Sequence, residues 1–285
     1  MKTIARLILS LLVCTSLSFC TANSKANAPV AADSFTIRTD WQTHFTNCRV
    51  EGSVVIFDRQ NKQWIVSDTT GIKTAVLPAS SFKVANLLIA LESGVIKDEN
   101  EVVKWPGATD TVKYGYRPEI YHDMTVREAF AESAGWVFVE LAKKIGKEKY
   151  QQHLKAYHYG NGVLTQTDAD FWNFGAFGIS PLNQVQFLQA LYEGQLPASQ
   201  RNMDIVKRVM KVEQDKGYTI SAKTGWTRDN GINTGWWIGY VESDKGVHFF
   251  ATRLLQDRRD KQDNFGACRK EITRTVLKDL GVLPK

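Results

Sequence analysis

Two short motifs that lie far apart in the chain carry residues suited to acyl transfer. Ser80-Ser81-Phe82-Lys83 is an S-x-x-K motif, and Lys223-Thr224-Gly225 is a K-T-G motif. A serine hydroxyl is a weak nucleophile until a base removes its proton. Lysine can act as that base only if its charge is suppressed or its amine is modified, because an ordinary lysine is protonated at pH 7. The motifs therefore predict a serine nucleophile with an altered lysine beside it.

The residues around Ser80 predict the helix that positions it. An apolar periodic run indicates a buried helix that begins near Pro78. Ser80 and Lys83 are three residues apart, so they share one face of its first turn. Backbone N–H groups at this end of a helix favour a developing oxyanion. Taken alone, an S-x-x-K motif is more often a surface serine beside a solvated lysine, so the hypothesis depends on the other motifs.

The wider pattern predicts an α+β fold in which strands from both ends of the chain enclose a helical region. β-branched runs at 51–58 and 63–68 predict a hairpin, and further strands are expected at 219–223, 235–241 and 247–252. Residues from about 100 to 212 are mostly helical in pattern, with helical periodicity at 126–145 and 181–192, and a last helix is expected from about 268 to 280. A site is expected where the sheet and the helical region meet.

The first 28 residues have the features of a cleaved secretory signal peptide. They combine a positive start, a short apolar stretch and the small-x-small sequence Ala26-Asn27-Ala28. The apolar stretch is too short and too interrupted to span a membrane. A lipoprotein anchor at Cys20 is disfavoured by the bulky Phe19 before it. We therefore expect export to the periplasm and one catalytic domain over residues 29–285.

Charge and histidine patterns exclude two other classes of protein. The formal net charge is +6, but the basic residues are scattered and form no stripe with interleaved aromatics, so no nucleic-acid partner is expected. The five histidines form neither an H-x-H nor an H-E-x-x-H pattern, so no metal is expected. Nothing in the pattern indicates an oligomeric state.

Two cysteines, Cys48 and Cys268, follow the predicted signal segment. In an oxidising compartment they could pair, but a sequence does not give the distance between them. We expect two separate buried thiols.

Over essentially its whole length after the signal segment, the chain resembles the class D (OXA-type) serine β-lactamases. Each motif is unspecific by itself, whereas the combination is highly specific. The matching motifs are Pro78-Ala79-Ser80-Ser81-Phe82-Lys83, Ser133-Ala134-Gly135, Tyr159-Gly160-Asn161, Phe171-Trp172, Lys223-Thr224-Gly225-Trp226 and Gly235-Trp236-Trp237-Ile238-Gly239. The resemblance implies the fold shared by β-lactamases and penicillin-binding transpeptidases, and hydrolysis of β-lactam antibiotics.

The resemblance also implies catalytic roles. Ser80 would be the acylated nucleophile. Lys83 would carry a carbamate formed with carbon dioxide or bicarbonate, and would act through it as the general base, since an ammonium ion has no lone pair to accept a proton. Trp172 would donate its indole N–H to the carbamate, and Ser133 would relay a proton to the leaving nitrogen. No dissociable cofactor is implied.

Substrate binding is implied for the K-T-G strand and the last helix. Lys223 and Thr224, with Arg269 as a further partner, would bind the carboxylate of the β-lactam. Gly225 belongs to the same binding strand, and the backbone N–H groups of Ser80 and Trp226 would form the oxyanion hole. The segment 227–234 is expected to be a loop that influences which β-lactams fit.

Simpler interpretations of the same residues remain open. Trp172 could be a core aromatic, Ser133 a helix N-cap and Arg269 a surface charge. Tyr159-Gly160-Asn161 could be a turn, and it also matches the Y-x-N motif of class C β-lactamases. In class D proteins this segment is mainly structural, and Ser133 together with the Trp-Trp strand favours class D.

The second motif departs from the class D pattern. That pattern is usually S-x-V, and here the third residue is Gly135. The valine helps to keep the modified lysine in an apolar pocket, and desolvation favours the neutral amine that reacts with carbon dioxide. With Gly135, either Trp136 fills the space or the pocket is wetter and the carbamate less stable. Ser81 in place of the usual threonine is a milder change.

Two other functions use the same chemistry. A β-lactam sensor or binder would be acylated and stay acylated, but such domains normally follow a membrane-spanning region. A D,D-peptidase would show an S-D-N or S-x-N second motif, which Gly135 excludes. A class A E-x-x-L-N deacylation motif is also absent, so Lys83 is the best remaining base.

Overall fold

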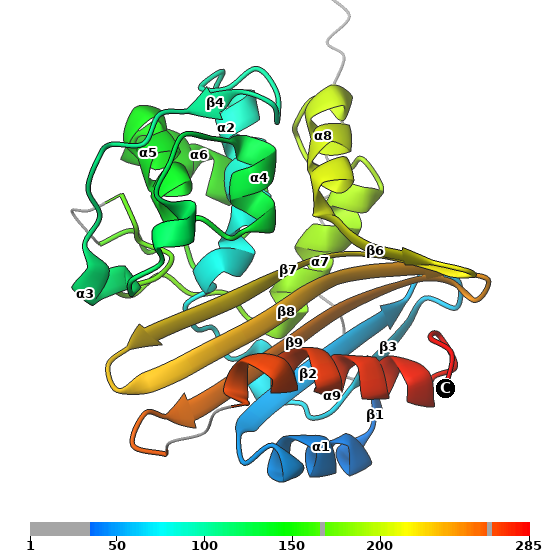
Figure 1. Ribbon diagram of the computed structural model, residues 1–285. Coiled ribbons are helices and arrows are strands. Elements are labelled where there is room, and N and C mark those ends of the chain that lie inside the picture. Colours follow the sequence, from blue (N-terminus) through cyan, green and yellow to red (C-terminus); the bar gives the residue numbers. More distant parts are fainter. Residues whose placement is uncertain (1–34, 166–168, 261–263) are drawn as a thin grey trace, which may run out of the picture. The chain divides into compact units, whose positions relative to one another are not determined.

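The structure, a computed structural model, describes residues 35–165, 169–260 and 264–285, and the predicted signal segment lies outside these residues. Their centre is a seven-stranded sheet with the order β1-β3-β2-β9-β8-β7-β6, in which only β1 and β3 are parallel (Figure 1). The strands are β1 (Phe35–Ile37), β2 (Glu51–Asp58), β3 (Gln63–Val66), β6 (Lys211–Asp215), β7 (Tyr218–Asp229), β8 (Ile232–Ser243) and β9 (Gly246–Asp257). Strands from both ends of the chain thus form one sheet, which confirms the predicted α+β class.

One face of the sheet is covered by the first and last helices. α1 (Gln42–Asn47) and α9 (Phe265–Asp279) pack on it, as Figure 1 shows. The core between them and the sheet is apolar on both sides, with Phe45, Trp237 and Ile272 among its buried members. Burial of each such side chain contributes about 1.5–3 kcal/mol, so this layer fixes the position of α9 against β8 and β9.

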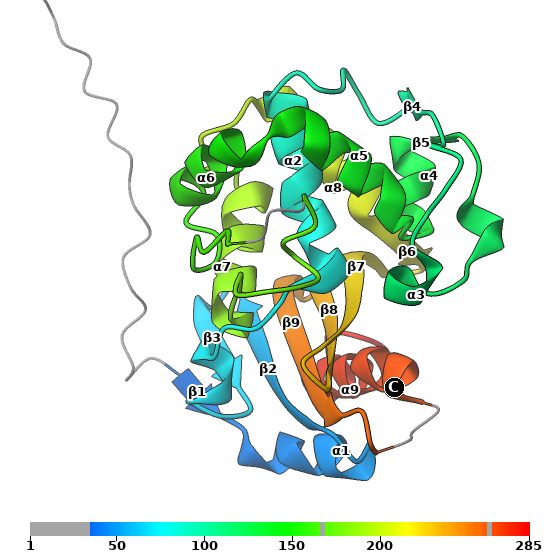
Figure 2. The same ribbon diagram turned by 90° about the vertical axis from the view of Figure 1, so that its left-hand side faces the viewer.

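The opposite face carries α7 (Pro181–Tyr192) and the helical region (Figure 2). Pro181 at the first helical position and the Ser180 side chain, which accepts from the N–H of Asn183, start α7 as the sequence predicts. The other elements of this region are the 3₁₀ turn Ala79–Phe82, α2 (Lys83–Glu92), β4 (Val102–Val103), α3 (Thr111–Tyr114), β5 (Met124–Thr125), α4 (Val126–Ala131), α5 (Gly135–Ile145), α6 (Lys147–Ala156) and α8 (Gln200–Met210). No helix of the described ranges is long and apolar enough to cross a membrane.

Two predicted elements differ in the structure. The expected helix over 126–145 is two helices, α4 and α5, separated at Ser133, whose φ is +57°. The expected loop over 227–234 is instead the end of β7, a turn at Asn230-Gly231 and the start of β8. The long run of paired residues makes this hairpin a rigid wall beside the K-T-G motif rather than a free loop.

The expectation of two separate thiols is wrong, because Cys48 and Cys268 form a disulfide. They are 220 residues apart in the chain, and the packing of α1 and α9 on one face of the sheet brings their Cα atoms to 6.2 Å. Cys48, Cys268 and Glu271 are also grouped closely enough to hold a metal, but both sulfurs are committed to the disulfide.

Candidate active site

Ser80 and Lys83 are brought together by the turn that precedes α2. Ser80 lies in the 3₁₀ turn and Lys83 is the first residue of α2, so the predicted start of the helix is 3₁₀ rather than α. The Nζ of Lys83 donates a hydrogen bond of 2.7 Å to the Oγ of Ser80. This is the distance that proton transfer between the two groups requires.

Contacts from distant segments hold this turn in place. The N–H of Ala79, whose φ is +51°, donates to the carbonyl of Trp172, and the indole N–H of Trp236 donates to the carbonyl of Leu77 at 2.8 Å. On the other side lies Gly225, where an added Cβ would come within 2.7 Å of the carbonyl oxygen of Pro78. The K-T-G glycine therefore permits the close approach of β7 to the serine turn.

Lys83 is fully buried. Its side chain is 0 % exposed, and its Nζ lies 5.2 Å from the centre of the Phe138 ring. Burial lowers the pKa of Lys83 from 10.5 to about 7, the nearby carboxylate of Asp170 opposes this change, and the guanidinium of Arg117 adds to it. A substantial part of Lys83 is therefore neutral near pH 7.

Ser133 and Lys223 form a second serine–lysine pair. The Nζ of Lys223 donates to the Oγ of Ser133 at 3.1 Å. Burial, and next the charge of Lys83, hold the pKa of Lys223 well below its usual value. Ser133 does not cap α5, because the N-cap residue is Ala134 and no side-chain cap bond is present. The left-handed φ of Ser133 turns the chain between the helices and directs its hydroxyl to Lys223.

Trp172 is fully buried beside the serine turn. Its ring stacks on Phe82 with a centroid distance of 5.3 Å. Its indole N–H has no hydrogen-bond partner among the described residues. A buried donor without an acceptor costs roughly 1–3 kcal/mol, so a core role alone leaves this N–H unexplained.

Arg269 is one of the residues of α9 that contact the K-T-G strand. Its Nε donates to the carbonyl of Gly266 at 2.9 Å, and its Nη1 donates to the carbonyl of Gly225. Its guanidinium carbon lies 5.9 Å from the centre of the Trp226 ring. Burial lowers the pKa of Arg269 to about 10, so the side chain is still a cation at pH 7.

A cavity of about 590 Å³ joins these groups. Ser80, Ser133, Thr224, Gly225, Trp226 and Arg269 line it, whereas Lys83, Lys223 and Trp172 are buried. All nine residues predicted from the sequence thus lie at or behind one cavity wall. The hydroxyls face the cavity, and the two amines that bind them are shielded from water.

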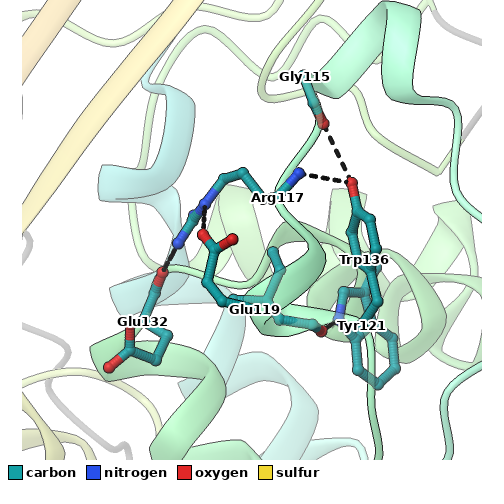
Figure 3. A network of polar contacts seen from close by, with 7 residues as sticks. Gly115, Arg117, Glu119, Tyr121, Glu132 and Trp136 are labelled. Atoms are coloured by element: carbon teal, nitrogen blue, oxygen red, sulfur yellow. Dashed lines mark hydrogen bonds and ion pairs between the residues drawn. The ribbon is translucent and has the colours of Figure 1, made fainter.

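The helical side of the cavity is held by a polar network, shown in Figure 3. The Nε of Arg117 donates to Glu119 at 2.8 Å, and its terminal nitrogens donate to the carbonyl of Glu132, next to Ser133, at 3.3 Å. The hydroxyl of Tyr121 accepts from the N–H of Arg117 and donates to the carbonyl of Gly115. This network fixes the segment before Ser133.

The Trp136 side chain, which follows Gly135, is anchored by contacts to Ile120 and Trp105. Its indole N–H donates to the carbonyl of Ile120 at 2.7 Å, and its ring packs edge-on against Trp105 (Figure 3 shows Trp136). A Cβ added at Gly135 would meet no atom within 4 Å outside the two adjacent residues and the backbone of its own helix. Gly135 therefore leaves open space in the cavity wall.

Asp170 is a residue of the site that sequence reasoning missed. It is buried, accepts from the hydroxyl of Tyr114 at 2.7 Å and from the side-chain amide of Asn173 at 2.8 Å. Burial raises the pKa of Asp170 to about 6, and its hydrogen bonds and the charge of Lys83 act in the opposite direction. The signal that would have found it is an acid directly before the buried Phe171-Trp172 pair.

The Tyr159-Gly160-Asn161 segment has a structural role in this fold. The Tyr159 ring is buried and its hydroxyl lies 3.2 Å from Oε1 of Gln184. The Asn161 side chain donates to the carbonyl of Ala176. None of the three residues lines the cavity that holds Ser80.

Comparisons with known proteins identify the family and the fold. The penicillin-binding protein transpeptidase domain matches residues 52–278. The β-lactamase OXA-48 of Klebsiella pneumoniae is 35% identical over 90% of this chain and 93% of its own, and OXA-10 of Pseudomonas aeruginosa is 34% identical over 88% and 92%. A class D β-lactamase structure from Sebaldella termitidis superposes with a TM-score of 0.81 at 36% identity, covering 87% of this chain and 98% of that one. The chain therefore belongs to the penicillin-binding transpeptidase-like fold and, within it, to the class D serine β-lactamases.

Proposed function

We propose that the enzyme hydrolyses penicillin-type β-lactams, and so gives resistance to them, through an acyl-enzyme on Ser80 with Lys83 as the general base. The observation that carries this proposal is the buried Nζ of Lys83, 2.7 Å from the nucleophile, with its pKa lowered to about 7. A lysine in that state can accept a proton or react with carbon dioxide, whereas a solvated lysine does neither readily at pH 7.

Acylation would use both serine–lysine pairs. The Oγ of Ser80 attacks the lactam carbonyl carbon and passes its proton to the base at Lys83. The C–N bond of the ring then breaks, and Ser133, hydrogen-bonded to Lys223, gives a proton to the departing nitrogen. The backbone N–H groups of Ser80 and Trp226 would bind the developing oxyanion.

Deacylation would return the enzyme to its starting state. A water molecule attacks the ester carbonyl while the base at Lys83 takes one of its protons. The C–O bond to Ser80 breaks, and the base at Lys83 returns the proton to the Oγ. Water is therefore the only nucleophile that this step needs. Because one buried position supplies the base for both halves, loss of Lys83 would stop both.

The chain's residues fit a carbamate on Lys83. A neutral amine combines with carbon dioxide and releases one proton, and the low pKa of Lys83 supports this reaction near neutral pH. Trp172 would hold the group with its indole N–H, which otherwise has no acceptor in the described structure. When present, the carbamate supplies an anionic base near pH 7.

The substrate carboxylate would bind at the K-T-G strand. Thr224 offers a hydroxyl on the cavity wall, Lys223 lies directly behind it, and Arg269 approaches from α9. Because Arg269 keeps its charge at pH 7, it can form a charge-assisted hydrogen bond with a carboxylate.

We further propose that the enzyme works in the periplasm after removal of a signal peptide. Residues 1–28 have the required pattern. The Cys48–Cys268 disulfide supports this, because such bonds persist in oxidising compartments.

The test is steady-state penicillin hydrolysis by the purified protein in degassed buffer, with and without added bicarbonate. Turnover that rises with bicarbonate supports a carbamate at Lys83, and insensitivity to bicarbonate contradicts that part of the proposal. Stoichiometric acylation of Ser80 without turnover, unrelieved by bicarbonate, would overturn hydrolysis and assign the protein to the β-lactam sensors. Cleavage of a D-Ala-D-Ala peptide would favour a peptidase.

A further inference from the structure

The charged residues on the cavity wall all have one sign. Among the described residues that line it there is no aspartate or glutamate. The basic lining residues come from both sides of the cavity: Lys113, Arg117, Arg228, Arg258 and Arg269. The carboxylate on the β-lactam ring system needs only Arg269 and the K-T-G residues to bind it. It therefore does not explain the other basic residues on the cavity wall.

Two of these arginines are not balanced by acids. No carboxylate of the described residues lies within ion-pair distance of Arg228 or Arg258, whereas the neighbouring Arg259 is paired with Asp257. The guanidinium carbon of Arg228 lies 5.0 Å from the centre of the Trp226 ring. The backbone N–H of Arg258 donates to the carbonyl of Gly231 at 2.9 Å, which places Arg258 beside the turn between β7 and β8.

The other two arginines are already engaged. Arg117 is bound to Glu119 and to the carbonyl of Glu132 (Figure 3). Arg269 is bound to the carbonyl of Gly225, at the position proposed for the ring carboxylate. Of the four arginines, Arg228 and Arg258 are therefore the two with charge available for another group.

The order of residues along β7 indicates which part of a substrate meets them. The ring carboxylate would lie at Thr224 and the reacting carbonyl at the N–H of Trp226. In a bicyclic β-lactam the carboxylate and the acylamino side chain leave from opposite ends of the fused rings. The side chain would therefore extend past Thr227 toward Arg228, which is four residues and about 13 Å from Thr224 along a strand.

No second strand of the described structure pairs with the cavity-facing edge of β7 along this path. Pairing with β6 ends at Ser221, and from Ala222 to Asp229 the described structure pairs β7 with β8 alone. A substrate amide can use such an edge in the way that an added strand does. The acylamino group would be held there with its far end near the hairpin turn.

We propose that Arg228 and Arg258 form a second anion site, which binds a carboxylate carried on the acylamino side chain of the β-lactam. The proposal rests on the proposed function, because it assumes that a β-lactam acylates Ser80. It names dianionic penicillins as the substrates that this cavity favours.

The test compares two substrates that differ by one carboxylate, benzylpenicillin and α-carboxybenzylpenicillin. The quantity measured is the ratio of their kcat/KM values, with the dicarboxylate in the numerator. Arg228→Gln and Arg258→Gln should each lower this ratio about two- to fivefold, the range for partly solvated charge pairs, and the double variant should lower it further. Lys144→Gln, an exposed charge change on α5 outside the cavity lining, should leave the ratio unchanged.

Salt provides a second readout. The wild-type ratio should fall between 0.05 and 0.5 M NaCl, because the screening length drops from more than 10 Å to a few Å. The ratio of the double variant should respond less. If Arg228→Gln fails to fold, two other variants test the site. Arg258→Gln should still lower the ratio of the kcat/KM values, and the charge-preserving Arg228→Lys should keep it.

An unchanged ratio in the double variant, or the same loss in Lys144→Gln, would overturn the proposal. A loss in Arg117→Gln alone would overturn the assignment to Arg228 and Arg258. Absence of turnover would overturn hydrolysis but not this inference. In that case the ratio is taken from the rates at which the two penicillins acylate Ser80, which are measured by intact-protein mass spectrometry. Absence of acylation by both would overturn both proposals.

Discussion

Cys268 is bonded to Cys48 and directly precedes Arg269 in the first turns of α9. The guanidinium of Arg269 in turn binds the carbonyl of Gly225. The disulfide therefore joins α1, α9 and the K-T-G strand into one connected unit. A covalent bond on the far face of the sheet thus constrains a residue at the cavity.

Replacing both cysteines by serine should lower stability and weaken substrate binding. The free energy of unfolding should fall by about 3–5 kcal/mol, because the bond closes a very long loop in the unfolded chain. With α9 less constrained, KM for a penicillin should rise more than kcat falls. Urea unfolding and steady-state kinetics measure the two effects.

The oxidised and reduced wild-type protein provide the matched control for this prediction. Reduction by dithiothreitol should reproduce both changes, and reoxidation should reverse them. Equal stability of the wild type and the Cys48→Ser/Cys268→Ser variant would contradict a stabilising role for the bond. A change in kcat alone would contradict the link to Arg269.

Replacing Lys83 by methionine should abolish hydrolysis and stabilise the fold. The folded protein holds Lys83 with a pKa of about 7 instead of 10.5, so below pH 7 it must bury an ammonium ion. This cost is fully present below pH 7 and disappears as the pH rises from 7 to 10.5. The gain from Lys83→Met should therefore be on the order of a few kcal/mol at pH 6 and shrink toward pH 10.

Thermal unfolding at several pH values in bicarbonate-free buffer measures this gain. Lys144→Met, on the exposed side of α5, is the control and should show no such pH dependence. Lys83→Ala should also lose nearly all hydrolysis and retain the fold. Normal turnover in either Lys83 variant would refute the assignment of Lys83 as the base.

Much of the fold could be predicted because it follows local periodicity. The α7 helix begins and ends at the predicted residues, and the β2–β3 hairpin and the three long strands are present. The proximity of Ser80 and Lys83 follows from their spacing, because residues three apart on a helical turn share a face. The strand β6 was missed, since its sequence Lys211–Asp215 is almost entirely polar and exposed.

The parts that could not be predicted depend on contacts between distant segments. Cys48 and Cys268 meet only because two helices pack on one face of the sheet. Asp170 is buried against Tyr114, which lies 56 residues before it and supplies one of its hydrogen bonds. The break at Ser133 interrupts a run whose periodicity continues on both sides, so the pattern alone indicates a continuous helix.

Replacing Gly135 by valine should reduce the bicarbonate needed for turnover. The position has room for a Cβ, which would meet no atom within 4 Å outside the two adjacent residues and the backbone of its own helix. An apolar side chain on the cavity wall would keep water from the region of Lys83 and favour its neutral and carbamylated forms. We expect the bicarbonate concentration for half-maximal activity to fall about threefold or more.

Gly135→Ala is the matched control for the valine variant. This change lowers the conformational freedom of the unfolded backbone, which should stabilise the helix by about 0.5–1 kcal/mol, and it adds only one methyl group. Its bicarbonate requirement should fall less than that of Gly135→Val. The same requirement in all three proteins would show that the open space at Gly135 has no effect on the modification of Lys83.

Replacing Asp170 by asparagine should extend activity to lower pH. The carboxylate of Asp170 raises the pKa of Lys83, so its removal should lower that pKa below about 7. A negatively charged carbamate on Lys83 would also no longer be repelled by the negative charge of Asp170. Both effects favour the neutral amine and its carbamate, while Tyr114 can still donate to the asparagine oxygen.

The measurement is the pH profile of kcat/KM for a penicillin between pH 5 and 8 at fixed low bicarbonate. In the wild type, activity should fall as the pH drops through about 7, and added bicarbonate should oppose this fall. In Asp170→Asn the same fall should occur at lower pH, with less need for bicarbonate. Tyr114→Phe removes a hydrogen bond that lowers the pKa of Asp170, so it should raise that pKa above about 6 and shift the profile in the same direction as Asp170→Asn, but by less. No shift in Asp170→Asn, or a larger shift in Tyr114→Phe than in Asp170→Asn, would show that the charge of Asp170 does not control Lys83.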